Sequence, residues 1–224
     1  MNQNDLLILE VEAISKSFGK TRVLDSLDLQ VPKGHIVEIR GANGSGKTTL
    51  LSILSSLTKP DSGAVMLNGL NVEKFGAIYR RCIGSVFHIP LIYEQLTPKE
   101  NLEHFGRLYR LPNVSEVVEE KISRLHLDHW VDQKVGTLSN GLRKRVSIAK
   151  SMLHGPQMLL LDEPDTGLDE ETIRILGDVF DEFSGNGGAV VLTTHTSSIK
   201  YRAPGCRYFL VAGKLSPERG PNHA

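Results

Sequence analysis

The sequence predicts an α/β fold built on a parallel sheet, and three observations carry that prediction. Short apolar runs recur along the chain, and several end in glycine, acidic or histidine residues. The glycine-rich run Gly41 to Gly46 lies between one such run and an apolar helical pattern, and strand, glycine loop and helix in this order form a recurrent supersecondary unit. From residue 97 to 126 the apolar residues follow a helical period, which indicates a small helical insertion.

The composition is that of an ordinary globular protein. The 224 residues suffice for one α/β domain, or for a core with one small subdomain. Lysine plus arginine and aspartate plus glutamate each number 26, so no global basic field attracts nucleic acid, and no nucleic-acid partner is expected. Cys82 and Cys206 are far apart and lack metal-ligand spacing, which predicts free thiols in a reducing compartment.

We expect neither a signal peptide nor a membrane-spanning segment in this chain. Its first residues lack the basic segment of a signal peptide, and no apolar run reaches the ~18–20 residues that span a bilayer. We therefore expect a cytoplasmic protein, which would use a partner's helices if it works at a membrane.

The first third of the chain is rich in predicted strands. Apolar alternation and short apolar runs predict strands at 6–14, 23–31 and 36–40, a helix at 47–57, and strands at 63–67 and 83–87. Phe18 lies in the turn between the first two strands, and Asn68-Gly69 is a typical hairpin turn after the fourth.

The rest of the chain alternates helices and buried strands. The predicted elements are two helices within 97–126 separated at Pro112-Asn113, a helix at 141–153, a strand at 158–161, a helix at 170–183, a strand at 189–193 and a hairpin at 208–215. The last eight or so residues are expected to fray.

The glycine-rich run matches a phosphate-binding motif. Gly41 to Thr48 fits G-x-x-x-x-G-K-[ST] in full. Glycines let successive N–H groups point at phosphate oxygens, and the following helix adds its N-terminal dipole. Lys47 supplies charge for the β- and γ-phosphates, and the Thr48 hydroxyl can reach Mg²⁺. The motif predicts a P-loop NTPase without separating kinase, GTPase, helicase and transporter. The predicted phosphate-binding residues are Gly41, Ala42, Asn43, Gly44, Ser45, Gly46, Lys47, Thr48 and Thr49.

Two acidic residues follow the buried run at 158–161. Asp162 is expected to hold Mg²⁺, which prefers oxygen ligands. Neighbouring residues at a strand end point in different directions, so Glu163 can face an attacking water while Asp162 faces the metal. The plain alternative is a solvated acidic turn before Pro164, which the buried strand and the upstream glycine loop disfavour.

Further segments resemble a known family. Residues 138–145, Leu-Ser-Asn-Gly-Leu-Arg-Lys-Arg, resemble the signature segment of ABC ATPases, usually Leu-Ser-Gly-Gly-Gln before a basic helix. Residues 165–169 resemble the D-loop of that family, and His195 resembles its switch histidine. Phe18 lies where the family places an aromatic residue that stacks on adenine. The resemblance covers essentially the whole chain.

The resemblance implies an architecture and a set of partners. The fold would be a RecA-like core with an antiparallel β subdomain (1–87 and 155–224) and a signature-bearing helical subdomain (88–154). The chain would bind ATP and Mg²⁺, with Lys47, Glu163 and His195 in catalysis. Ser139 and Gly141, with Asp169 as a further binding residue, would contact ATP held by a second copy of the chain, so that two ATP molecules lie between two protomers.

Several of these residues also have plain structural interpretations. Ser139 or Asn140 could merely cap a helix, and Asp169 could cap the next one. Phe18 could be a core aromatic, and His195 a surface loop residue.

The sequence departs from the family pattern in two places. His88 stands where the family has a glutamine that offers an oxygen to Mg²⁺; nitrogen suits Mg²⁺ poorly, so we expect His88 to act through water or to be neutral to metal binding, with mild pH sensitivity. Asn140 and Leu142 replace a glycine and the glutamine of the signature. Asparagine tolerates positive φ, so the loop shape is expected to survive and the ATPase to remain active.

The sequence leaves four functions to be distinguished. The first is the ATP-hydrolysing subunit of an ABC transporter, peripheral on the inner face of the cell membrane and joined to an integral membrane subunit; residues 100–109 resemble bacterial exporter ATPases more than sugar importers. The second is a soluble ABC ATPase of a cytosolic complex, such as one that assembles iron–sulfur clusters. A chromosome or repair ATPase would need a long coiled coil or tandem cassettes, and a small-molecule kinase leaves the Ser139 segment unexplained.

Overall fold

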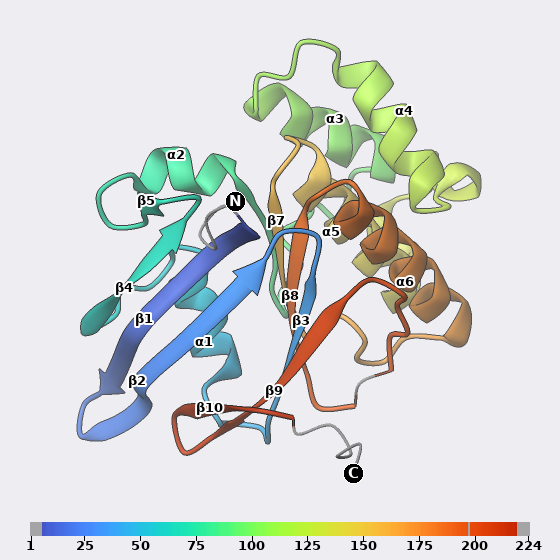
Figure 1. The fold of residues 1–224 in the computed structure, drawn as a ribbon. Coiled ribbons are helices and arrows are strands. Elements are labelled where there is room, and N and C mark those ends of the chain that lie inside the picture. Colours follow the sequence, from blue (N-terminus) through green and yellow to red (C-terminus); the bar gives the residue numbers. More distant parts are fainter. Residues whose placement is uncertain (1–5, 197, 219–224) are drawn as a thin grey trace.

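The computed structural model describes residues 6–196 and 198–218. Two sheets lie side by side, with helices between them and on one outer face (Figure 1). The strands are β1 (Leu7–Phe18), β2 (Thr21–Pro32), β3 (Ile36–Arg40), β4 (Ser62–Leu67), β5 (Leu70–Asn71), β6 (Ile83–Val86), β7 (Met158–Asp162), β8 (Ala189–Thr194), β9 (Gly205–Val211) and β10 (Lys214–Pro217). The α-helices are α1 (Lys47–Leu54), α2 (Gly76–Arg81), α3 (Pro98–Leu108), α4 (Val114–Arg124), α5 (Asn140–Met152) and α6 (Glu170–Gly185).

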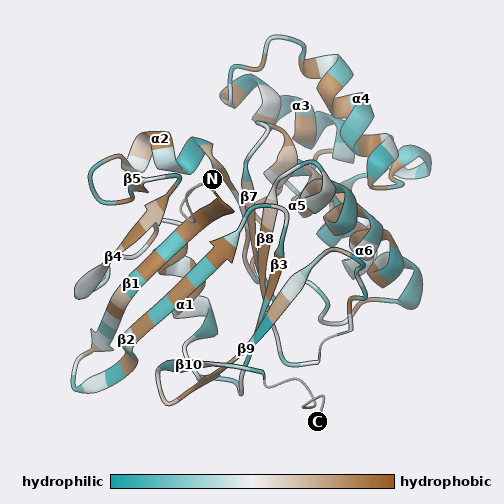
Figure 2. Cartoon of the chain, viewed as in Figure 1, coloured by the Kyte–Doolittle hydropathy of each residue, from teal (hydrophilic) through white to brown (hydrophobic). Residues whose placement is uncertain are grey.

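The larger sheet forms the centre of the molecule. Its six strands have the order β10-β9-β3-β8-β7-β6, and all neighbours are parallel except β10 and β9. Strands β3, β7 and β8 are almost entirely buried and largely apolar, as expected when helices or a second sheet cover both faces (Figure 2). Because these strands are parallel, the loops that follow them meet at one edge of the sheet.

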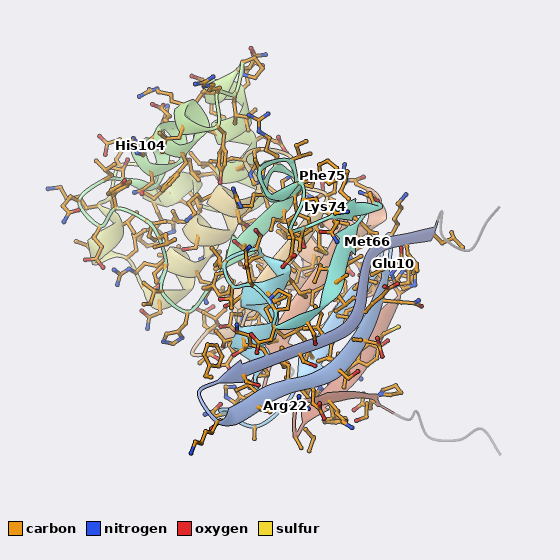
Figure 3. All side chains as sticks on the ribbon, turned by 90° about the vertical axis from the view of Figure 1, so that its left-hand side faces the viewer. Glu10, Arg22, Met66, Lys74, Phe75 and His104 are labelled. Carbon is orange, nitrogen blue, oxygen red and sulfur yellow. The ribbon has the colours of Figure 1, made fainter. Side chains whose placement is uncertain are left out.

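The smaller sheet is antiparallel, with the order β2-β1-β4-β5. Its strands alternate between buried apolar and exposed polar residues, which is the pattern of a sheet with one solvated face. Figure 3 views that outer face, where Glu10 and Met66 are cross-strand neighbours. Arg22 marks the outer end of the β1–β2 hairpin in the same view.

The helices complete two apolar cores. Leu50 and Leu54 of α1 pack in a core that joins the small sheet to one face of the large sheet. On the other face, α5 and α6 pack over β7 and β8, and α3 and α4 extend the same core through Leu102 and Val118. Within the described residues, no helix has both the length and the apolar character that crossing a membrane requires.

The structure confirms most predicted elements and corrects several bounds. Strand β3 has the predicted limits, whereas β1 is longer, so that Phe18 ends the strand rather than lying in the turn. Helix α1 ends at Leu54, because Ser56 adopts a left-handed φ of 62°. Helix α2 was not predicted, since six residues are too few to show a helical period. The predicted fraying of the C-terminus falls mostly on 219–224, outside the described residues.

Candidate functional site

Four predicted site segments lie at the carboxyl edge of the large sheet. The glycine-rich loop follows β3, Asp162 ends β7, His195 follows β8, and His88 comes shortly after β6. Ligands of open α/β sheets bind at this edge, because the loops there converge. A cavity of about 400 Å³ occupies the position and is lined by Val23, Asn43, Gly44, Gly46, Lys47, Thr48, Thr49, His88, Asp162 and Glu163.

The loop conformation depends on its glycines. Gly44 and Gly46 have φ values of 79° and 106°, which favour glycine over other residues. At Gly41, an added Cβ would lie 2.6 Å from the Ser45 hydroxyl and 2.8 Å from the carbonyl oxygen of Leu210. The Ser45 hydroxyl is buried and has no hydrogen-bond partner within the described residues. The cradle therefore fits a ligand rich in oxygen atoms, such as a phosphate chain.

Lys47 carries its charge into this loop. The side chain is only 5% exposed, and its ammonium donates to the carbonyl oxygens of Gly41 at 2.8 Å and Ala42 at 3.2 Å. The same ammonium lies 3.4 Å from a carboxylate oxygen of Glu163. A bound phosphate chain would thus meet a positive charge that the loop itself holds in place.

Asp162 is held by two threonines. Its Oδ2 accepts a hydrogen bond from the Thr48 hydroxyl at 2.8 Å, and its Oδ1 accepts one from the Thr193 hydroxyl at 2.7 Å. Two adjacent oxygen donors, Thr48 and Asp162, suit Mg²⁺, which usually takes few protein ligands and completes its shell with phosphate and water. The described residues contain no cluster of three or more His, Cys, Asp or Glu side chains that could hold a metal ion. Sequence reasoning missed Thr193.

Glu163 faces other partners than Asp162 does. Its carboxylate lies between the Lys47 ammonium and the His195 imidazole, whose Nδ1 is 3.6 Å from Oε2. The backbone of Glu163 has a left-handed φ of 46°, and its N–H donates to the carbonyl and hydroxyl oxygens of Thr193. This conformation directs the two neighbouring carboxylates to different sides of the strand end.

A second cavity adjoins the first. Its volume is about 470 Å³, and it shares His88 and Glu163 with the loop cavity. Lys144 of α5 lines this second cavity. Burial lowers the pKa of Lys144, while the nearby Asp162, Asp165 and Glu163 favour its charged form. Lys144 was not singled out from the sequence, because a basic residue early in a helix has no distinctive spacing.

The segment between β7 and α6 is tied to the strand end of β8. Asp165 accepts hydrogen bonds from the hydroxyls of Thr194 and Thr196 and from the N–H of Ser198. Burial alone would raise the pKa of Asp165, but these hydrogen bonds prevail and lower it. These hydrogen bonds tie the loop that carries Asp165 to the end of β8.

The Ser139 segment lies outside the loop cavity. Ser139 is the N-cap of α5, with its hydroxyl accepting from the N–H of Leu142 at 3.3 Å, and Asp169 is the N-cap of α6. A Cβ at Gly141 would lie 2.8 Å from the Thr172 hydroxyl, so glycine permits close packing of α5 on α6. Neither Ser139 nor Gly141 lines the loop cavity.

The structure corrects two expectations for single residues. Asn140 lies inside α5 and does not have a positive φ, so the expected use of asparagine's left-handed tolerance was wrong. The core interpretation of Phe18 was also wrong, because Phe18 is 55% exposed. Phe18 does not line the loop cavity, whereas Val23 of the same hairpin does and approaches Gly46.

Comparisons with known proteins show the family of this chain. A model of the ABC transporter family matches residues 24–166, more than half of the chain. The chain is 35% identical over 189 residues to an uncharacterised ABC transporter ATP-binding protein, YdbJ, of Bacillus subtilis, and covers 61% of it. It is 35% identical over 196 residues to the doxorubicin resistance ATP-binding protein DrrA of Mycobacterium tuberculosis, and covers 59% of it.

Other relatives are covered more fully. The ABC transporter ATP-binding protein NatA of Bacillus subtilis is 33% identical over 178 residues, which are 78% of this chain and 72% of that protein. Among solved structures, a nucleotide-free ATP-binding cassette from an ABC transporter superposes with a TM-score of 0.84 at 27% identity, covering 96% of this chain and 92% of that one. The α/β fold is thus that of a P-loop ATPase cassette, and the chain belongs to the ABC transporter family as an ATP-binding domain.

Proposed function

We propose that this chain is the ATP-hydrolysing subunit of an ABC transporter and that it works as a head-to-tail pair beneath separate membrane subunits. One observation carries the proposal: three separate segments converge on one edge of the sheet and bring together Lys47, Thr48, Asp162, Glu163 and His195. The chain spans about 60% of the length of the first relatives it matches, 61% and 59%.

The loop cavity would hold the phosphate chain of ATP. Backbone N–H groups of residues 41–49 would surround the phosphate oxygens, and Lys47 would exchange its contacts with carbonyl oxygens for contacts with the β- and γ-phosphates. Thr48 and Asp162 would hold Mg²⁺, which neutralises charge on the phosphates. Phe18 would stack on the adenine from the neighbouring hairpin.

Glu163 would act on the attacking water. Its carboxylate would take a proton from the water as the water oxygen bonds to the γ-phosphorus, and the bond from that phosphorus to the β-phosphate oxygen would break to release ADP and phosphate. His195 would hold the γ-phosphate, and Lys47 would stabilise charge on the leaving oxygens. His88 lines the cavity and would contact the metal only through water.

A second copy would complete each site. Ser139 and Gly141, with Asp169 close by, lie outside the cavity of their own chain. In the proposed pair, the N-terminus of α5 from one protomer would face the γ-phosphate held by the other, where the helix dipole favours negative charge. Hydrolysis would then remove the ligand that holds the two protomers together.

The membrane partner is proposed from the relatives. Relatives named for doxorubicin resistance and for Nod factor export favour an exporter-type system, with the chain on the inner face of the membrane. The conformational change driven by ATP would pass to the membrane subunit through residues 88–154, the proposed helical subdomain. The ATP-binding parts would be residues 1–87 and 155–224. The balance of 26 basic and 26 acidic residues gives no reason to propose a nucleic-acid partner, and the relatives give no support to the cytosolic alternative.

Phosphate release without an acceptor tests the proposal. The wild-type chain with Mg-ATP should release free phosphate when no acceptor is present, and Glu163→Gln should not. Turnover that needs an acceptor in both proteins would instead identify a kinase. Isolation of the chain from its cells should recover a protein with several apolar spans, whereas recovery of a soluble complex would refute the transporter role.

A further inference from the structure

Phe18 stands on a protruding piece of the small sheet. Strand β1 pairs with β4 only as far as Ser15, opposite Ser62, while its pairing with β2 continues to Phe18, opposite Thr21. The last residues of β1 therefore belong to a two-stranded ribbon, with register irregularities on either side of Lys16. Such ribbons are weakly held on their own. An exposed aromatic at this position needs a brace if its ring is to present a fixed face.

Asp61 supplies that brace. Its Oδ1 accepts from the Lys16 ammonium at 2.8 Å, and its Oδ2 accepts from the backbone N–H of Ser17 at 2.7 Å. The backbone N–H of Asp61 donates to the carbonyl oxygen of Ser15 at 2.9 Å, which fixes Asp61 against the same strand. One residue before β4 thus holds the three residues that precede Phe18. The Lys16 ammonium and the Ser17 N–H keep the pKa of Asp61 below its usual value.

Lys16 in turn occupies one face of the aromatic ring. Its ammonium lies 5.6 Å from the ring centroid of Phe18, at cation–π distance, and the Lys16 side chain is only 16% exposed. Lys16 and Phe18 are two residues apart on β1, so both project from the same side of the strand. A cation on one face draws π-electron density toward itself, which leaves the opposite face less negative and better suited to stack on an electron-rich purine.

We propose that Asp61 and Lys16 are positioning residues for base recognition: Asp61 fixes Lys16 and the end of β1, and Lys16 orients and polarises the Phe18 ring for a purine on its other face. This inference rests on the proposed ATPase function and assigns two further residues to that site. Neither residue touches the phosphate loop, so their effect is confined to the base. They contribute to the affinity for the nucleotide and leave the chemical step alone.

The test compares two ligands that share a triphosphate. Binding of Mg-ATP and of Mg-tripolyphosphate is measured by calorimetry on the full chain and on Lys16→Met, Asp61→Asn, Lys16→Arg and Lys74→Met. The control residue Lys74 is exposed and lies far from the hairpin end at Arg22 (Figure 3). We expect Lys16→Met and Asp61→Asn to weaken ATP about five-fold and leave tripolyphosphate unchanged. Lys16→Arg keeps a cation over the ring and restores ATP affinity, and Lys74→Met behaves as wild type.

A second background separates stacking from general damage. Phe18→Leu should weaken ATP about ten-fold, and adding Lys16→Met should cost nothing further, because the ring on which Lys16 acts is gone. In steady-state assays, Lys16→Met should raise KM while kcat stays constant.

Three outcomes overturn the inference. Equal losses for ATP and tripolyphosphate would assign Lys16 and Asp61 a merely structural or long-range electrostatic role. Unchanged ATP affinity in Lys16→Met, or a further loss in the Phe18→Leu background, would separate Lys16 from the ring. A wild-type chain that binds neither ligand would refute the proposed ATPase function itself, and this inference with it, whereas the first two outcomes leave that function intact.

Discussion

Two helix N-termini of this chain differ in how their first N–H groups are satisfied. Helix α1 begins after Gly46, which has no side chain to cap it, and faces the cavity of the glycine-rich loop. Helix α5 begins after Ser139, whose hydroxyl already caps the N–H of Leu142, and it faces no cavity shared with Lys47. The first terminus lies beside the proposed catalytic residues Lys47 and Glu163. For the second, the proposed ligand lies on a second copy of the chain.

The largest expected effect concerns Glu163, which lies beside Lys47 at the N-terminus of α1. Glu163→Gln removes the carboxylate beside Lys47 and His195 but keeps its shape, so hydrolysis should fall roughly a thousand-fold. ATP binding should remain, and the unreacted ATP should hold two protomers together. Light scattering coupled to gel filtration would show a dimer in Mg-ATP.

A Glu163→Gln monomer in Mg-ATP would contradict the proposed difference between the N-termini of α1 and α5. It would mean that α5 does not complete a site on another copy, even if each chain binds ATP. Wild-type protein in Mg-ADP is the control and should scatter as a monomer.

The second prediction separates the two roles of Ser139. Ser139→Ala removes the N-cap of α5 and should cost about 1 kcal/mol of stability. The matched control Thr97→Ala breaks the capping box of α3 at a similar cost, far from the phosphate loop. Only Ser139→Ala should also lower the hydrolysis rate, by about ten-fold, because a hydrogen bond to phosphate is lost. Equal rates in the two variants would leave Ser139 a cap alone.

The third prediction concerns Thr193, which orients Asp162 from β8. Thr193→Val keeps the side-chain shape but removes the hydroxyl that donates to Asp162 and accepts from the Glu163 N–H. Loss of such outer partners typically weakens metal affinity about 10- to 100-fold. A titration of ATPase rate against Mg²⁺ should show the half-saturating concentration rising by about ten-fold, with the rate largely recovered at high Mg²⁺.

The smallest expected effect concerns Lys150, in the last turn of α5. Lys150 of α5 donates to the carbonyl oxygen of Leu91 at 2.8 Å and lies over the Phe105 ring, and burial lowers its pKa to about 8. Between pH 8 and 10.5 the unfolded chain then binds more protons than the folded chain, so stability should rise with pH in that window. The free energy of unfolding of wild type relative to Lys150→Met should increase by about 1 kcal/mol, after allowance for partial exposure. Parallel pH profiles in chemical denaturation would contradict this.

The sequence predicted the large sheet well because its strands are short, apolar and bounded by turns. β3, β7 and β8 appear within a residue of their expected limits. The glycine-rich loop was equally clear, since its spacing follows from the geometry of holding phosphate. Local patterns of this kind are strong wherever burial on both faces leaves few alternatives.

Other features depended on contacts that no local pattern encodes. Thr193 acts on Asp162 across two strands, and Asp61 reaches Lys16 from 45 residues away. Asn140 was expected to need a left-handed backbone, yet the helix begins one residue earlier than assumed and removes that need. The roles of such residues follow from the tertiary pairing of strands rather than from residue type.

The left-handed backbone of Glu163 has a consequence for how this protein can change. A residue with a Cβ pays roughly 1 kcal/mol in that conformation compared with glycine, and asparagine tolerates it better than glutamate. Under the proposed mechanism, substitutions of Glu163 that relax the end of β7 would raise the stability of the chain and abolish its ATP turnover. Selection of variants for thermal stability alone would therefore favour inactive proteins at position 163, because stability and ATP turnover favour different residues there.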